Sequence, residues 1–85
     1  MNINNLERCF YEASKQEKKY VGVKIKMEGF QKAEIIINEN ANFDKKFAYY
    51  KNAYNPDLTL KTFNGIKIVG FTYGDSFAEI EKDLI

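Results

Sequence analysis

The sequence predicts an α+β domain in which three helices are combined with one four-stranded antiparallel sheet, in the order αββαββα. Three observations support this class. Apolar residues recur at helical spacing in three segments, and they alternate at strand spacing in others. The dipeptide Asn64-Gly65 between two apolar segments is the strongest short signal for a β-hairpin. At this length, residues 1–85 are expected to form a single domain.

The first predicted helix covers residues 4–17. Its apolar residues recur at helical spacing: Leu6, Phe10 and Ala13. A short polar side chain at Asn4 or Asn5 can cap this helix, because it accepts a hydrogen bond from a backbone N–H that has no partner inside the helix. The segment therefore presents one apolar face to the rest of the domain.

A hairpin is expected to follow this helix. In residues 20–27 apolar side chains alternate with glycine or lysine, and this period of two predicts a strand with one solvent-exposed face. Residues 28–30 turn the chain. Residues 33–38 then predict a strand that is more completely buried.

A second helix is predicted to begin at Asn42, with Asp44 in its first turn, where negative charge suits the helix dipole. Its aromatic residues recur at helical spacing as one stripe: Phe43, Phe47, Tyr50 and Tyr54. Asn55-Pro56 ends the helix, because proline disfavours the helical conformation of the residue before it.

The remaining residues predict a second hairpin and a short helix. Residues 58–63 and 66–73 are expected to be strands on either side of the Asn64-Gly65 loop. Ser76 and Glu79 match a capping box at the start of a C-terminal helix. The apolar side of this helix is formed by Phe77, Ile80 and Leu84.

This order of elements favours a circularly permuted ferredoxin-like sandwich, since moving the last strand to the front gives the order βαββαβ. Such a permutant has the strand order 3-4-2-1. The second and fourth strands are apolar on both faces and fit the centre of the sheet. The first strand, residues 20–27, alternates like an edge strand, so we expect it at one edge.

Phe71 and Tyr73 raise a question about function because they lie at alternate positions of the last strand. On an exposed sheet such rings could stack on nucleic-acid bases, whereas on a covered face they fill a core. A two-residue loop at Asn64-Gly65 pairs Leu58 with Phe71, Leu60 with Val69 and Phe63 with Ile66, and it places Phe71 on an apolar face. A bulged three-residue loop would turn Phe71 to the opposite surface. We expect both rings to point into the core.

Composition limits the class of protein. The chain is 45% hydrophobic and 15% aromatic, which is too rich for a disordered chain. Its formal net charge of +1 gives no general attraction to nucleic acid or membrane. The longest apolar run, Ile35-Ile36-Ile37, is too short to span a bilayer, and the first ten residues lack the pattern of a secretion signal. We therefore expect a cytoplasmic protein.

Residues that commonly carry catalysis are scarce. The chain has no histidine, which is the commonest general base and zinc ligand. Its single cysteine, Cys9, lies on the apolar side of the first helix, where a cysteine is usually an inert core residue. No glycine-rich phosphate loop or calcium loop is present. The sequence predicts a protein that is not an enzyme and that needs no cofactor or metal.

Charge is unevenly distributed along the chain. Residues 15–32 sum to +4 and residues 75–85 to −3. The simplest explanation is that lysines protect an edge strand from pairing with other chains, and that acidic residues keep the C-terminal segment soluble. The functional alternatives are a phosphate-facing patch at Lys24 and Lys26, or an acidic prong that occupies a basic groove of a partner.

The first functional hypothesis is a small protein-binding module that acts as an inhibitor or adaptor. The candidate residues are tyrosines that the core does not require and the acidic residues of the C-terminal segment: Tyr11, Tyr20, Tyr49, Asp75, Glu79, Glu81 and Asp83. Twelve lysines against one arginine, together with nine asparagines, indicate an AT-rich gene from a low-GC bacterium or its phage. The chain resembles, in general character, phage and mobile-element accessory proteins that inhibit host nucleases or defence systems.

The second hypothesis is a weak nucleic-acid-binding protein that tolerates different sequences. Its surface would combine four lysines with an aromatic ring at Tyr20 or Phe71: Lys24, Lys26, Lys61 and Lys67. A third hypothesis is a homo-oligomer that associates through Phe63, Ile66 and Ile68 if no helix covers them.

Overall fold

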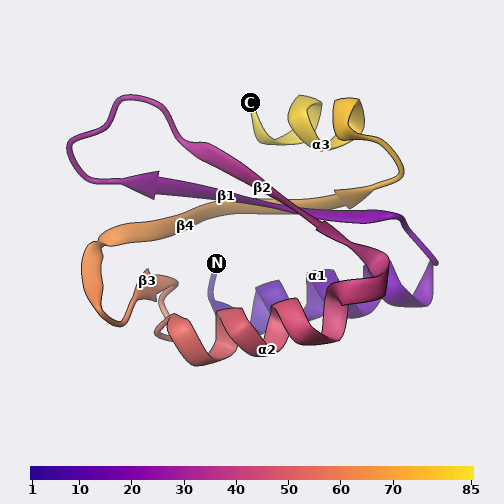
Figure 1. Cartoon of the computed structure of the whole chain (residues 1–85), viewed down its shortest axis with the longest axis horizontal. Helices are drawn as coiled ribbons and strands as arrows, with labels where there is room; N and C mark the ends of the chain where they lie inside the picture. Colours follow the sequence, from indigo (N-terminus) through magenta and orange to yellow (C-terminus); the bar gives the residue numbers. More distant parts are fainter.

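The computed structural model describes residues 1–85 and contains the predicted elements in the predicted order. The elements are α1 (Ile3–Lys15), β1 (Tyr20–Met27), β2 (Glu34–Glu39), the 3-10 helix η1 (Asn40–Asn42), α2 (Phe43–Ala53), β3 (Thr59–Leu60), β4 (Phe63–Gly74) and α3 (Phe77–Leu84). The α+β class and the order αββαββα are confirmed. Helices α1 and α2 cover one face of the sheet, and α3 lies on the other (Figure 1). No helix has the length and apolarity needed to cross a bilayer.

The order of the strands differs from the prediction. The sheet has the order β2-β1-β4-β3 and is antiparallel throughout, so β1 lies in the centre and β2 at an edge. The ferredoxin-like permutant with order 3-4-2-1 is therefore wrong. The prediction failed because every second residue of β1 is glycine or lysine, which suggests a face open to water. In the structure α3 packs directly on Gly22, so that face is partly covered.

The main core lies between the sheet and the helices α1 and α2. It consists of one cluster of buried residues: Leu6, Cys9, Phe10, Ala13, Val21, Val23, Phe43, Tyr50, Tyr54, Leu58 and Ile68. Phe10 contacts Phe43 edge-on, with ring centroids 5.5 Å apart. Buried Asn38 donates to the Val21 carbonyl at 3.0 Å and accepts from the Tyr50 hydroxyl at 3.4 Å. The predicted aromatic stripe of α2 is thus confirmed as a core-facing stripe.

Helix α1 begins slightly earlier than predicted, and its cap is Asn2 rather than Asn4 or Asn5. The Asn2 side chain accepts from the Asn5 N–H at 3.0 Å, and the Asn5 side chain accepts from the Asn2 N–H at 2.8 Å. This reciprocal pair satisfies two backbone donors at the helix start. Asn5 therefore contributes as the partner of the cap.

The second hairpin turns at Lys61-Thr62 and not at Asn64-Gly65. Leu60 pairs with Phe63, and the predicted Asn-Gly loop lies inside β4. The Gly65 carbonyl accepts from the Glu28 N–H at 2.7 Å, which extends the pairing of β4 with β1 beyond Met27. This longer pairing outweighs the local turn preference of Asn-Gly. The partner strand β3 is short. It begins only at Thr59, because the fully buried Leu58 has a φ of 72°, which is not an extended conformation.

A β-bulge in β4 sets the direction of Phe71 and Tyr73. Ile25 pairs with Ile68 and Lys24 pairs with Gly70, so Val69 is an extra residue. Ile68 and Phe71 consequently face the same side although they are three positions apart. Phe71 and Tyr73 are half-buried and pack against the main core, as predicted, although β4 does not make the predicted pairings.

Helix α3 lies close to the sheet because glycines form the floor beneath it. A side-chain carbon at Gly70 would lie 3.3 Å from Leu84, and one at Gly22 would overlap Ile80. The predicted cap is present, since the Ser76 hydroxyl accepts from the Glu79 N–H at 3.2 Å. At the other end, the Lys24 ammonium donates to the Leu84 carbonyl at 2.6 Å. The cap stabilises the first turn of the helix, and the Lys24 bond fixes its last turn to the sheet.

Candidate protein-binding surface

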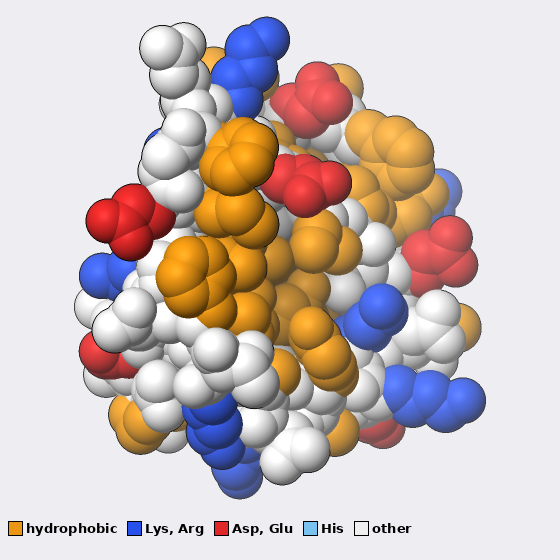
Figure 2. Space-filling model, turned by 60° about the vertical axis from the view of Figure 1, so that its left-hand side comes forward, with side chains coloured by type: hydrophobic (Ala, Val, Ile, Leu, Met, Phe, Trp, Pro, Cys, Tyr) orange, Lys and Arg blue, Asp and Glu red, His pale blue; other side chains and the backbone are white.

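An apolar groove opens where the β1–β2 hairpin approaches α2 and the start of β4. Its volume is about 370 Å³, and most of its lining is apolar: Ile25, Met27, Phe30, Lys32, Glu34, Tyr49, Tyr54, Leu60 and Ile66. We call it the hairpin groove. Figure 2 shows hydrophobic side chains gathered in a broad stripe over this end of the molecule, with charged side chains around them.

Three large side chains of the hairpin groove are strongly exposed. The exposed fraction is 61% for Phe30, 56% for Tyr49 and 37% for Met27. Lys32 and Glu34 place opposite charges at the same groove. Contiguous apolar surface bordered by polar residues is typical of sites that bind proteins or ligands.

Local structure explains why these residues meet. Met27 lies opposite Ile66 in the β1–β4 pairing, so both side chains face the same side of the sheet. Gly29 has a φ of 89°, a conformation that glycine adopts without strain, and it turns the chain just before Phe30. Tyr49 lies next to the buried Tyr50, and their ring centroids are 5.4 Å apart. The groove is therefore built from three separate segments.

A second groove, which we call the lysine groove, lies on the α3 side of the sheet beyond the end of that helix. Its volume is about 680 Å³, and it is lined by basic and apolar residues: Lys24, Lys26, Gln31, Lys32, Ala33, Ile35, Val69, Leu84 and Ile85. Lys26 lies directly opposite Lys67 in the β1–β4 pairing. Like charges in that position destabilise a sheet, so an anion near them would be favourable.

The other predicted residues of the nucleic-acid surface are less well placed. Lys61 lies in the turn between β3 and β4, and Phe71 points to the opposite side of the sheet. Lys67 also has an acidic neighbour, because its charge adds to the hydrogen bonds from Thr59 in lowering the pKa of Asp57. Phe63 is 50% exposed, and its ring lies over Gly65. It is the aromatic residue that the sequence did not suggest for this surface.

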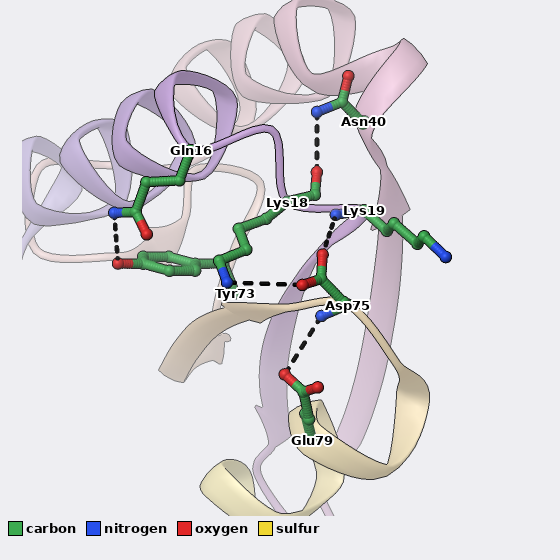
Figure 3. A network of polar contacts seen from close by, with 7 residues as sticks. All are labelled: Gln16, Lys18, Lys19, Asn40, Tyr73, Asp75 and Glu79. Atoms are coloured by element: carbon green, nitrogen blue, oxygen red, sulfur yellow. Dashed lines mark hydrogen bonds and ion pairs between the residues drawn. The ribbon is translucent and has the colours of Figure 1, made fainter.

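The acidic residues of the C-terminal segment are largely engaged inside the fold (Figure 3). Asp75 accepts from the Lys19 N–H at 3.1 Å and from the Lys18 ammonium at 3.5 Å. Glu79 accepts from the Asp75 N–H at 3.3 Å. These contacts tie the start of α3 to the loop between α1 and β1.

The last two acidic residues differ from each other. Asp83 accepts from the Thr72 hydroxyl at 3.1 Å and so holds α3 to β4. Glu81 is exposed, and its carboxylate forms no hydrogen bond or ion pair with the protein. A free acidic prong is thus reduced to Glu81, while the other three carboxylates support the fold.

The predicted tyrosines lie in three different places. Tyr20 is half-buried, and its ring centroid is 5.0 Å from that of Phe77. Tyr11 is 61% exposed and lines a separate groove between α1 and α2. Only Tyr49 belongs to the hairpin groove. Sequence reasoning missed Phe30 and Met27 as surface residues, because one was assigned to a turn and the other to the apolar side of a strand.

The buried ionisable groups remain neutral at physiological pH. Burial raises the pKa of the Cys9 thiol from 9.0 to about 12. Burial also raises the pKa of Tyr50 to about 12, although the hydrogen bond with Asn38 acts in the opposite direction. A thiol with such a pKa is a poor nucleophile. No group of three or more metal-ligating side chains comes together in the structure.

No protein-family model, no curated protein and no solved structure matches this chain. The function is therefore inferred from the surface of the chain itself.

Proposed function

We propose that this protein is a small protein-binding module whose hairpin groove receives apolar side chains of a partner protein. The observation that carries the proposal is the exposure of Phe30 and Tyr49 at one apolar groove. Aromatic residues that border a pocket are typical anchors of protein interfaces, because each buries a large apolar area with little loss of side-chain freedom.

Charge supports a protein partner as well. Lys32 and Glu34 lie at the groove with opposite signs, so a partner can be oriented by one acidic and one basic residue. A bound segment would cover apolar surface that water now contacts. This burial would favour binding by about 25 cal/mol for each Å² of apolar area removed from water. The partner segment is therefore expected to be mainly apolar and to carry both an acidic and a basic residue.

The biological role that we propose is inhibition or adaptation of a host protein by a phage or mobile element. The lysine-rich and asparagine-rich composition supports an origin in an AT-rich genome. A module of this kind acts by occupying a surface of its target, such as a nuclease or a defence protein, and needs no catalytic group of its own. Its site of action would be the host cytoplasm.

The proposal is tested by comparing variants in a binding experiment. The immobilised wild-type protein is expected to retain a host protein in stoichiometric amount, and the affinity for that protein is then measured with purified components. The double variant Phe30→Ala, Tyr49→Ala should bind about 100-fold more weakly, at about 1.4 kcal/mol for each lost anchor. Tyr11→Ala is the matched control, since Tyr11 is equally exposed but lies outside the groove. Equal affinity of both variants would contradict the proposal.

The direct opposition of Lys26 and Lys67 favours a second candidate function, the weak binding of single-stranded nucleic acid at the lysine groove. Titration with a labelled oligonucleotide at ~50 mM salt should show binding that weakens as salt increases. The variant Lys26→Glu, Lys67→Glu should abolish it, whereas Lys45→Glu on α2 should not. Absence of binding by the wild-type protein at that salt concentration would exclude this function.

A further inference from the structure

The two edges of the sheet are different. At one edge, β3 has only two residues and is bounded by Leu58 and the Lys61-Thr62 turn. At the other edge, β2 has six residues, Glu34–Glu39, without lysine or proline. Apart from its pairing with β1, no backbone group of β2 hydrogen-bonds to another part of the chain's backbone. Long edge strands of this kind are usually protected, because they can pair with another strand.

The hydrogen-bond pattern shows which residues of β2 direct their backbone N–H and C=O groups away from β1. Asn40 lies opposite Lys19 and donates its N–H to the Lys19 carbonyl at 2.9 Å. Since hydrogen-bonded pairs alternate along an antiparallel ladder, Glu34, Ile36 and Asn38 bond to β1. The N–H and C=O groups of Ile35 and Ile37 therefore point away from the sheet and are free to pair.

The side chains of β2 are self-complementary in one register. In an antiparallel pair of β2 strands centred on Ile36, Ile35 of each copy lies opposite Ile37 of the other, and the two Ile36 residues face each other. Ile35 and Ile37, whose backbone groups are free, then lie opposite each other and can exchange hydrogen bonds between the two copies. Glu34 lies opposite Asn38 and Glu39 opposite Ala33, so no like charges are directly opposed.

We propose that two copies of this chain associate through β2, in antiparallel pairing about a twofold axis at Ile36, and join their sheets into one continuous sheet. The alternative registers fit less well. Centring on Ile37 places Glu39 against Ile35, and centring between Ile36 and Ile37 opposes outward-pointing to inward-pointing backbone groups and Glu34 to Glu39. The net charge of +1 adds little repulsion between copies. This inference is independent of the hairpin groove.

The first test is the oligomeric state of variants at Ile35. Ile35→Pro removes an outward-pointing N–H and leaves the hydrogen bonds to β1 intact, because proline is tolerated at such edge positions. Ile35→Ala shortens the same side chain but keeps the N–H. Sedimentation at a low and a high protein concentration should show dimers for the wild type and for Ile35→Ala, and monomers for Ile35→Pro. A monomeric wild type at high concentration, or a dimeric Ile35→Pro, would overturn the proposal.

The second test reports the register and does not depend on the folding of the proline variant. Two Ile36 residues across the axis form a non-hydrogen-bonded pair with Cα atoms about 4.5 Å apart, which is within the range of a disulfide. Ile36→Cys should therefore form a covalent dimer on mild oxidation. Ile35→Cys should not, because its neighbour is Ile37. The native Cys9 is buried and does not interfere. Absence of the Ile36→Cys cross-link, or equal cross-linking at both positions, would overturn the pairing.

Discussion

The two faces of the sheet are covered in different ways. On the side of α1 and α2, large side chains fill a thick layer, and the ring of Phe10 contacts those of Phe43 and Tyr50. On the side of α3, glycines of β1 and β4 let a short helix lie almost on the backbone. One face is stabilised by the area of the side chains that it buries, and the other by close approach. The first face depends on large buried side chains, and the second depends on positions that have no side chain.

The largest effect is expected from truncation on the thick face. Phe10→Ala removes a nearly fully buried ring and should lower the free energy of unfolding by about 3–5 kcal/mol. Ile80→Ala, the corresponding change on the α3 face, should cost about 2 kcal/mol, because a short helix can settle into the space left behind. Denaturant unfolding measures both values.

A control for Phe10→Ala is available in the next residue. Tyr11 is 61% exposed, and Tyr11→Ala should change the free energy of unfolding by no more than about 0.5 kcal/mol. If Ile80→Ala proved more costly than Phe10→Ala, the distinction between a thick and a thin face would be wrong.

The next effect tests the glycine floor. Gly22→Ala places a methyl group where the Ile80 side chain now lies, and it should destabilise the fold by about 1–3 kcal/mol. Gly70→Ala is the matched comparison, because its added carbon would lie 3.3 Å from Leu84 and needs only a small shift. Thermal unfolding of the two variants should rank Gly22→Ala as clearly less stable. Equal melting temperatures would show that α3 does not depend on close approach.

A smaller effect is expected at the start of α3. Ser76→Ala removes the side-chain acceptor for the Glu79 N–H and should cost about 1 kcal/mol. Ser14→Ala, inside α1 on an exposed position, is the control and should be nearly neutral. Unfolding by urea would detect the difference. A Ser76→Ala variant as stable as Ser14→Ala would show that the cap does not contribute to the stability of the fold.

The smallest effect at neutral pH is a loss of stability that begins only in alkaline solution. The pKa values of Cys9 and Tyr50 rise from 9.0 and 10.0 to about 12 on burial. Above pH 9 the unfolded chain therefore loses protons that the folded chain retains, so the free energy of unfolding falls as pH increases towards 12.

Both buried groups lie on the thick face, so this alkaline sensitivity belongs to that face alone. Cys9→Ala should reduce the slope of stability against pH between pH 9 and 11, as measured by urea unfolding at each pH. An unchanged slope in that variant would contradict the assignment.

The sequence predicted the kinds of elements correctly because periodicity reports which side of an element is buried. The aromatic stripe of α2 and the cap of α3 were both visible in this way. The strand order could not be predicted in this way. Gly22 interrupts the apolar pattern and so suggests an exposed face, whereas in the fold a glycine is needed there because α3 packs directly on it. The turn at Lys61-Thr62 was missed because pairing of β4 with β1 overrides the local preference of Asn64-Gly65.

The candidate surface was only partly predictable for a similar reason. Tyr49 could be identified because it lies outside the stripe of α2 that faces the core. Phe30 lies in a loop, where sequence periodicity carries no information on exposure. The acidic residues of the C-terminal segment looked free, but their hydrogen bonds to the α1–β1 loop and to β4 arise only in the folded chain.

The extra residue at Val69 acts as a phase shift in β4. Before it, odd-numbered positions of the strand look towards α3, and after it they look towards α1 and α2. If β4 kept Val69 but ran as a regular strand without the bulge, either Ile66 and Ile68 or Phe71 and Tyr73 would be turned out of the interior. The bulge at Val69 thus allows one strand to supply apolar side chains to the same layer on both sides of an odd-numbered spacing.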